Sequence, residues 1–267
     1  MTGENQPRYR VPWRIRWLGV QRIVRGQPAS CAADMARMLA VAPAPPRLDG
    51  LEHIPLSGPL LVTQNHFSRP GLGAWWATSL AFTAIARARG HEPVWMVTSE
   101  WYYQDFVRSA VITPLTRWLF GRAARVWGFL PMPPDERDLA RRAAAVRQTL
   151  ERARALFAHG GALGIAPEGR GETVLLQPPA GAGRVLLRLA AGITVLPVGI
   201  CEEEGRLVGR FGPAYTLARR PGEEKRDEDA RIASEVMAAI AALLPPAMRG
   251  PYGAAVHDGA LAGVFGG

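Results

Sequence analysis

Lysine and cysteine are scarce in this chain. Lys225 is the only lysine among 32 basic residues, so arginine carries nearly all of the positive charge. The two cysteines, Cys31 and Cys201, are far apart and belong to no CxxC or Cys/His ligand pattern. The sequence therefore predicts neither a metal site nor a disulfide framework, and a reducing cytoplasmic setting suits it.

Long apolar runs are also missing. The longest stretch without a charged residue, 70–86, contains glycine, threonine, serine and proline, and it falls short of the roughly 20 apolar residues that span a bilayer. We expect a buried helix there, and a re-entrant or interfacial segment is the alternative. The residues expected on its buried face are Trp75, Trp76, Leu80, Phe82 and Ile85. The N-terminal residues also lack the apolar core and small-residue cleavage site of a secretory signal, so none is expected.

The remaining composition is that of a globular protein with an excess of positive charge. The 267 residues are 48% hydrophobic and 21% charged, which is enough to form the core of one α/β domain. The net charge of +9 favours a polyanionic partner, either nucleic acid or an anionic membrane. Because the basic residues are not interleaved with aromatic ones in a recognisable nucleic-acid-binding module, we expect no nucleic-acid partner.

Residues 8–39 form a basic and aromatic block that contains seven arginines. The residues Trp13, Trp17, Val20 and Val24 recur at spacings of four, three and four, which predicts one apolar face of a helix. Tryptophan and arginine together on such a helix favour the bilayer interface. The alternative is a helix that packs on the core and exposes its arginines to solvent.

Short apolar segments alternate with helical patterns in the rest of the chain. We expect strands at 59–63, 94–98, 162–166 and 193–200. Helices are expected at 139–157 and 229–244. This alternation predicts an α/β fold with a mixed, partly parallel sheet flanked by helices, preceded by an N-terminal amphipathic helical segment.

Three parts are expected along the chain. Residues 1–46 are the basic amphipathic segment and a proline-rich linker, 47–248 the α/β domain, and 249–267 a flexible tail.

Three short motifs stand where expected strands end. They are Asn65-His66-Phe67-Ser68, Ala166-Pro167-Glu168-Gly169-Arg170 and Leu196-Pro197-Val198-Gly199-Ile200. Each motif alone is weak evidence, because a lone histidine after a strand is more often structural than catalytic. Their order matters more, because ligands gather at the carboxyl ends of parallel strands.

With these motifs the sequence resembles the glycerolipid acyltransferase family, which includes the 1-acylglycerol-3-phosphate acyltransferases. The first motif of that family reads Asn-His-x-Ser-x-x-Asp, the third is Pro-Glu-Gly after a hydrophobic strand, and the fourth is a strand ending in Val-Pro-Val-Gly. The residues that match are Asn65, His66, Ser68, Pro167, Glu168, Gly169 and 196–199, with leucine in place of the first valine. The resemblance covers residues 48–213.

The resemblance implies acyl transfer with His66 as the general base. The acyl group would come from acyl-CoA or acyl-carrier protein, with no bound cofactor, and would pass to a hydroxyl of a lysophospholipid or a related glycerolipid or glycolipid. A neutral imidazole suits this role at cytoplasmic pH. The scarce cysteines and the basic, aromatic N-terminal block lead us to expect a cytoplasmic protein that is peripherally associated with anionic phospholipid on the inner face of the cell membrane.

The first motif departs from the family at the aspartate that orients the imidazole. That position holds Gly71 in this chain. We name Glu100 and Asp105, which follow the second expected strand, as possible replacements for the missing carboxylate. If nothing replaces it, the alternative function is a catalytically impaired protein that keeps the acyltransferase fold as a lipid-binding or scaffold module.

The third motif is altered as well. The family continues Pro-Glu-Gly with Thr-Arg-Ser, whereas Arg170 follows the glycine directly here. Arg137, after the short apolar segment 128–130, is the candidate for the phosphate-binding arginine of the second family motif. The residues expected to bind or position substrate are therefore Asn65, Ser68, Arg137, Glu168, Gly169 and Arg170.

Overall fold

The structure is a mixed α/β fold built on one eight-stranded sheet. The computed structural model describes residues 7–99, 106–132 and 139–254, with the backbone alone at 106–111 and 139–142. The strands are β1 (Arg47–Asp49), β2 (Leu60–Gln64), β3 (Val94–Val97), β4 (Leu130–Pro131), β5 (Ala162–Ile165), β6 (Thr194–Glu203), β7 (Arg206–Phe211) and β8 (Tyr215–Thr216).

The sheet is parallel at its centre and antiparallel toward one edge. The strand order is β1-β7-β6-β2-β5-β3-β4, and β8 pairs with β6. The pairs β2/β5, β2/β6, β3/β5, β3/β4 and β1/β7 are parallel, whereas β6 is antiparallel to both β7 and β8. The central strands β2 and β5 therefore end at the same edge of the sheet, as the alternating pattern predicts.

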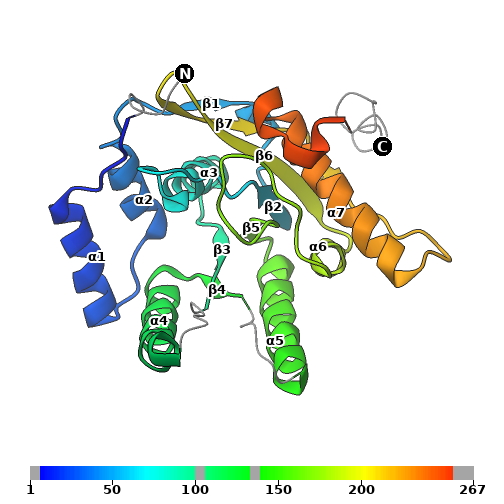
Figure 1. Ribbon diagram of the computed structural model, residues 1–267, viewed down its shortest axis with the longest axis horizontal. Helices are drawn as coiled ribbons and strands as arrows, with labels where there is room; N and C mark the ends of the chain where they lie inside the picture. The colour runs from blue at the N-terminus through cyan, green and yellow to red at the C-terminus, as the bar shows by residue number, and fades with distance from the viewer. Residues whose placement is uncertain (1–6, 100–105, 133–138, 255–267) are drawn as a thin grey trace.

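Helices cover both faces of this sheet. They are α1 (Trp13–Arg25), α2 (Cys31–Leu39), α3 (Ala74–Arg89), α4 (Phe106–Trp127), α5 (Leu139–Ala158), α6 (Ala182–Leu189) and α7 (Lys225–Ala242), with short 3-10 turns η2 (Leu51–His53), η3 (Pro246–Met248) and η4 (Gly250–Tyr252). Figure 1 shows α2 and α3 on one side of the sheet and α6 and α7 on the other.

Neighbouring residues of one strand enter different cores. In β2, Leu60 and Val62 pack in the core under α3, whereas Leu61 packs in the core under α5, α6 and α7. Every residue of β2 is buried. A strand covered on both faces reads as a continuous apolar run, which is why the sequence shows 60–63 without alternation.

Most of the expected elements are confirmed. The four expected strands correspond to β2, β3, β5 and β6, and the helix expected at 139–157 is α5. Helix α7 begins four residues before the expected position, at Lys225. The expectation for α3 is wrong at one residue: Trp76, Leu80, Phe82 and Ile85 are buried, but Trp75 is 59% exposed. Most of the expected tail, 255–267, lies outside the described residues.

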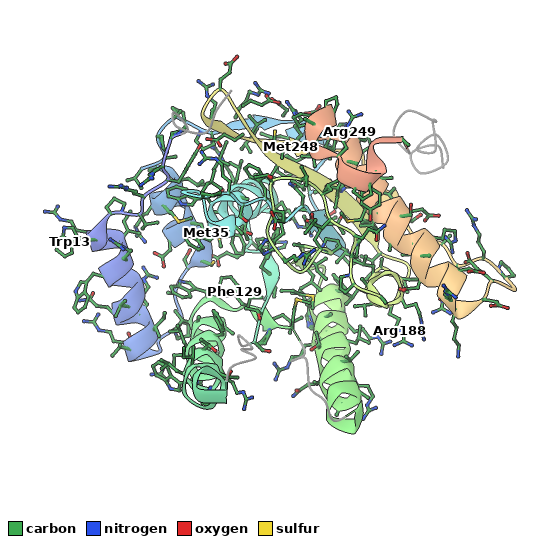
Figure 2. All side chains as sticks on the ribbon, in the orientation of Figure 1. Trp13, Met35, Phe129, Arg188, Met248 and Arg249 are labelled. Carbon is green, nitrogen blue, oxygen red and sulfur yellow. The ribbon has the colours of Figure 1, made fainter. Side chains whose placement is uncertain are left out.

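Helix α1 begins directly after Pro12, as the spacing of its apolar residues predicts. None of its residues is buried, so the alternative of a core-packed helix is wrong. Trp13 is 66% exposed and lies at the outer edge of the molecule (Figure 2). In the described ranges, no helix is both long enough and apolar enough to cross a bilayer.

Candidate active site

His66 lies immediately beyond the carboxyl end of β2, and Asn65 fixes the turn that carries it. The buried amide of Asn65 donates to the Ile200 carbonyl (2.8 Å) and accepts from the Ile200 N–H (2.7 Å). The side chain thus continues the pairing of β2 with β6 after the strand itself has ended. These contacts use both polar atoms of Asn65, which supports a role in positioning His66. Contact with substrate stays a prediction.

Glu168 holds His66 from the neighbouring strand. It follows β5, and its carboxylate accepts from the N–H of His66 (2.5 Å) and the N–H of Leu176 (3.1 Å). Burial raises the pKa of Glu168 above its ordinary value, and the two N–H donors partly oppose that rise. Burial, together with the charge of Glu168, also raises the pKa of Tyr252 to about 12. Glu168 is therefore a buried acceptor that joins two loops.

The loop after Glu168 is hydrogen-bonded to the loop that carries His66. The N–H of Glu172 donates to the His66 carbonyl (3.1 Å), and the N–H of Ser68 donates to the Glu172 carbonyl (3.2 Å). Gly169 makes the turn between Glu168 and Glu172 with a φ of +71°, and its N–H donates to the Ala166 carbonyl (3.2 Å). The expected first and third motifs therefore meet in one structure.

The imidazole of His66 is partly buried, and one of its nitrogens has no partner. Nδ1 is buried without a hydrogen bond. A Cβ built on Gly171 would lie 2.6 Å from this atom and 2.4 Å from Ser68 Oγ, so the glycine backbone covers this edge of the ring. Burial lowers the pKa of His66 below its ordinary value of 6.5. The ring is therefore neutral near pH 7.

Gly71 does not face the imidazole. Arg69 and Leu72 exchange two backbone hydrogen bonds (3.0 and 2.9 Å) around a tight Pro70-Gly71 turn. Gly71 has a φ of +83°, and a Cβ built on it would meet Arg8. In this backbone, a side chain at position 71 would therefore point toward Arg8 and away from the imidazole.

A buried ion pair anchors this same turn. Arg69 donates to Glu202 through Nε (2.5 Å) and Nη2 (2.6 Å), and the two side chains are 4% and 8% exposed. The guanidinium also donates to the carbonyls of Pro7 (2.8 Å) and Pro70 (2.9 Å). The N–H of Tyr9 donates to the Gly71 carbonyl (2.8 Å), so the N-terminal segment crosses the turn.

The other expected residues lie in different surroundings. Arg170 is exposed beside the Gly169 turn, and Ser68 is half-buried. Glu100, Asp105 and Arg137 lie outside the described residues, so their expected roles stay predictions. The sequence analysis missed Gly171, Arg69 and Glu202. Only Arg69 gave a local signal, as the charged residue directly before the uncharged stretch 70–86.

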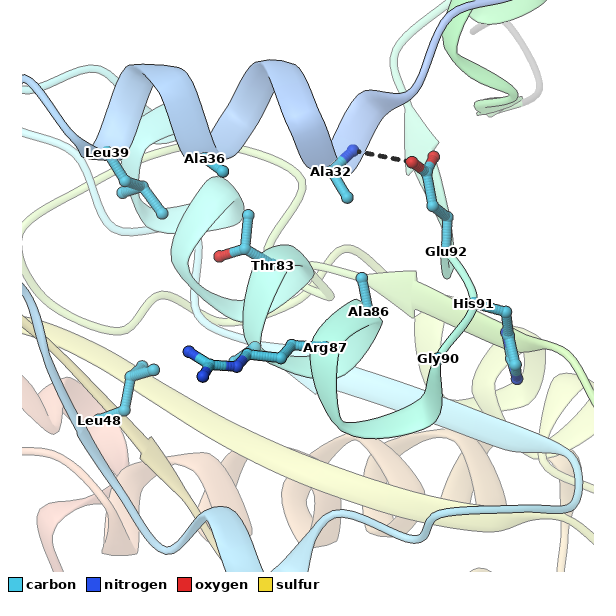
Figure 3. A pocket seen from close by; sticks show the side chains of 11 residues that line it. Ala32, Ala36, Leu39, Leu48, Thr83, Ala86, Arg87, Gly90, His91 and Glu92 are labelled. Carbon is cyan, nitrogen blue, oxygen red and sulfur yellow. Dashed lines mark hydrogen bonds between the residues drawn. The ribbon is translucent and has the colours of Figure 1, made fainter.

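A hollow of about 630 Å³ opens elsewhere, between α2 and α3. Figure 3 shows Ala32 and Ala36 of α2 facing Thr83 and Ala86 of α3 across it. Glu92 closes one end, where its carboxylate accepts from the N–H of Ala32 (3.1 Å). None of the residues that line the hollow belongs to the loops around His66, so it is separate from the candidate site.

Comparison with known proteins finds little. No protein-family model matches the chain, and no curated protein matches its sequence significantly. Among solved structures, the chain is similar to the crystal structure of the 1-acyl-sn-glycerophosphate (LPA) acyltransferase from Thermotoga maritima, with a TM-score of 0.42 and 12% identity over 85% of this chain and 80% of that chain.

Proposed function

We propose that the chain is an O-acyltransferase of the phospholipid or glycerol type. It transfers a fatty acyl group from acyl-CoA or acyl-carrier protein to a hydroxyl of a lysophospholipid or a related glycerolipid or glycolipid. One observation carries the proposal: a partly exposed, neutral histidine lies at the carboxyl edge of the central strands, where a glycine turn and an exposed arginine adjoin it.

Nε2 of His66 is the nitrogen that acts on the acceptor. Since Nδ1 is buried against Gly171, the opposite nitrogen is the one that an incoming hydroxyl meets. Nε2 takes the hydroxyl proton as the oxygen attacks the thioester carbonyl carbon. When the tetrahedral intermediate collapses, the C–S bond breaks and the thiolate leaves. The imidazolium then gives the proton to the thiolate or to water, which restores the neutral ring.

Arg170 is the proposed donor for the oxyanion and for an acceptor phosphate. The N–H of Gly169 already donates to Ala166, whereas the Arg170 side chain is exposed beside the turn. A guanidinium offers two parallel donors to phosphate and a positive charge to a developing oxyanion. Glu168 acts through the backbone of His66 and is a positioning residue.

The proposed site of action is the inner face of the cell membrane, with anionic phospholipid as the partner. The exposed tryptophans of α1, Trp13 and Trp17, support this proposal, because indole rings favour the interface between headgroups and acyl chains.

The test of acyl transfer is an assay of the purified chain with radiolabelled acyl donors. Acyl-CoA and acyl-carrier protein are each paired with lysophosphatidic acid, other lysophospholipids, and a lysoglycolipid. We expect an esterified product from at least one pair, and donor hydrolysis without acceptor is the background to subtract. An acyl-CoA that binds but is not transferred to any acceptor contradicts the proposal.

A second candidate function is a lipid-binding or scaffold module without turnover. The unpartnered Nδ1 favours it, because no carboxylate among the described residues stabilises the imidazolium. In a serine-protease triad, loss of the equivalent aspartate lowers the rate about 10⁴-fold. This candidate predicts lipid or acyl-donor binding that is unchanged when His66 is replaced.

Gly71→Asp is expected not to raise activity. An aspartate there would sit in the left-handed region beside Arg8 instead of at Nδ1, and the backbone strain would cost about 1–2 kcal/mol. Steady-state kinetics and thermal unfolding measure both effects. The control is Gly71→Asn, which imposes similar strain without the charge. A gain in kcat specific to the aspartate would show that the turn rearranges to supply the missing carboxylate.

Gly171→Ala is expected to lower kcat on the order of 10²-fold while the protein stays folded. The added methyl would displace the imidazole and Ser68, and small misplacements of a catalytic group have effects of this size. The matched control is Gly253→Ala, where an added Cβ has open space. Unchanged kcat with a cooperative unfolding transition would mean that the packing of Gly171 on Nδ1 does not position the base.

A further inference from the structure

Helix α1 exposes an apolar face that the rest of the described chain leaves uncovered. Trp13, Trp17, Val20 and Val24 are 66%, 56%, 46% and 65% exposed. Their spacing puts them on one side of the helix. The guanidinium of Arg14 lies over the Trp13 ring, 5.8 Å from its centroid, so charge and indole stand together at the start of this face.

Helix α4 exposes a second apolar face, one that the sequence pattern did not reveal. Leu115, Trp118 and Leu119 are 58%, 54% and 36% exposed. They lie three and four residues apart, on one side of the helix, whereas Thr113 and Thr116 are buried. Between Thr113 and Leu119 the helix therefore turns two threonines inward and three large apolar side chains outward, which is the reverse of a water-facing helix.

The two helices are fixed to each other by hydrogen bonds. Arg122 of α4 donates to the carbonyls of Ile23 (2.9 Å) and Val24 (3.0 Å) at the end of α1. After α1, the N–H of Ala29 donates to the Val126 carbonyl of α4 (2.8 Å). The exposed residues of α1 and α4 therefore belong to two helices that hydrogen bonds hold together.

The charge of this unit has a single sign. Neither α1 nor α4 contains an aspartate or a glutamate. Arg14, Arg16, Arg25 and Arg125 are exposed on the two helices. Apolar side chains bordered by guanidinium groups match a surface that offers acyl chains below a layer of phosphates.

We propose that α1 and α4 together form one docking surface for an anionic phospholipid bilayer. We call it the α1–α4 face and define it by Trp13, Trp17, Val20 and Val24 of α1 and Leu115, Trp118 and Leu119 of α4. The inference rests on the proposed membrane attachment and adds a contact from within the α/β domain. Because only Gly128 and Phe129 separate the end of α4 from β4, this contact orients the sheet, and with it His66, relative to the bilayer.

The test measures partition of the full-length chain onto sedimented vesicles. Vesicles of phosphatidylcholine with and without phosphatidylglycerol are compared for the parent and for Leu115→Ala/Trp118→Ala. We expect the parent to bind the anionic vesicles, and the variant to bind at least about tenfold more weakly with its fold intact. The matched control is Leu51→Ala/Leu56→Ala, which truncates exposed leucines before β2 and should bind as the parent does.

Each other outcome overturns a different statement. If the parent and the α4 variant bind equally, α4 is not part of the docking surface, although attachment through α1 stands. If the parent does not bind anionic vesicles, membrane attachment fails as a whole. Transfer to a short-chain, water-soluble acceptor, assayed in parallel, tests the catalytic proposal separately. A dimer of the parent that the α4 substitutions dissociate would identify a second copy of the chain as the occupant.

Discussion

His66→Ala is expected to lower kcat/KM for acyl transfer by roughly 10²–10⁴-fold, the range for removing a general base. Among the described residues, His66 carries the one imidazole that lies where the His66 and Glu168 loops meet, and a neutral imidazole is a suitable base near pH 7. The variant keeps the backbone bonds of residue 66 to Glu168 and Glu172, so the loops should remain in place. Single-turnover kinetics with labelled donor measure the chemical step.

The matched control is His159→Ala. His159 is exposed on the end of α5, where its Nδ1 lies 2.8 Å from the Ala155 carbonyl. This variant should transfer acyl groups at the parent's rate. Equal turnover by His66→Ala and the parent would remove His66 from the chemistry.

The pH profile of the parent gives a second readout of the same base. His66 is active when neutral, and burial lowers its pKa below 6.5. The acid limb of kcat/KM should therefore have its midpoint below pH 6.5, and His66 should be fully deprotonated and active at neutral pH. The free energy of unfolding also depends on this pKa. Between the lowered pKa and 6.5, His66 binds a proton in the unfolded chain but not in the folded one. Stability therefore falls as pH falls through this window. A midpoint above 6.5 contradicts the burial of the ring.

Arg69→Ala is expected to lower the free energy of unfolding by about 3–5 kcal/mol, because it leaves the Glu202 carboxylate buried without its partner. The arginine also donates to the carbonyls of Pro7 and Pro70, so the variant removes one of the hydrogen bonds that hold the N-terminal segment to the turn. Urea denaturation followed by circular dichroism measures the change. Activity should fall as well, since this turn begins three residues after His66.

The double variant Arg69→Met/Glu202→Leu distinguishes the loss of the ion pair itself from the cost of leaving one buried charge without its partner. Replacing both buried partners with apolar side chains should recover most of the loss. The control is Asp49→Ala, whose ion pairs with Arg47 and Arg210 are partly exposed and should contribute at most about 1 kcal/mol. If Arg69→Ala costs no more than Asp49→Ala, the pair does not anchor the turn.

Local sequence patterns were sufficient to predict the strands that consist of continuous apolar segments. Strands β2, β5 and β6 are buried on both faces, so the sequence shows them as short apolar runs that end at polar motifs. Because ligands gather at the carboxyl ends of parallel strands, the order of the motifs was enough to name Asn65, His66 and Glu168 as candidates for one site. The helix periodicity of α1, α5 and α7 was visible for the same local reason.

Elements whose apolar and polar residues follow no regular period were not predicted from the sequence. Helices α4 and α6 were not predicted, and neither was β7, which pairs with both β1 and β6. Helix α4 contains Pro114 and turns threonines inward and leucines outward, so its pattern lacks the usual amphipathic order. Trp75 and Trp76 are adjacent and equally apolar, so the sequence does not show which of them is buried. The way α3 packs on the sheet decides that Trp76 is buried and Trp75 is exposed.

The sequence by itself determined the α/β class, the central strands and the histidine at their edge, because burial on both faces and strand order leave a local record. The tertiary structure decided that Gly171 covers Nδ1, that Gly71 turns toward Arg8, and that Arg69 reaches Glu202. These contacts join residues about a hundred or more positions apart, or depend on the sign of one φ angle. No period of apolar residues encodes such pairings, since they arise only when loops from different strands are packed together.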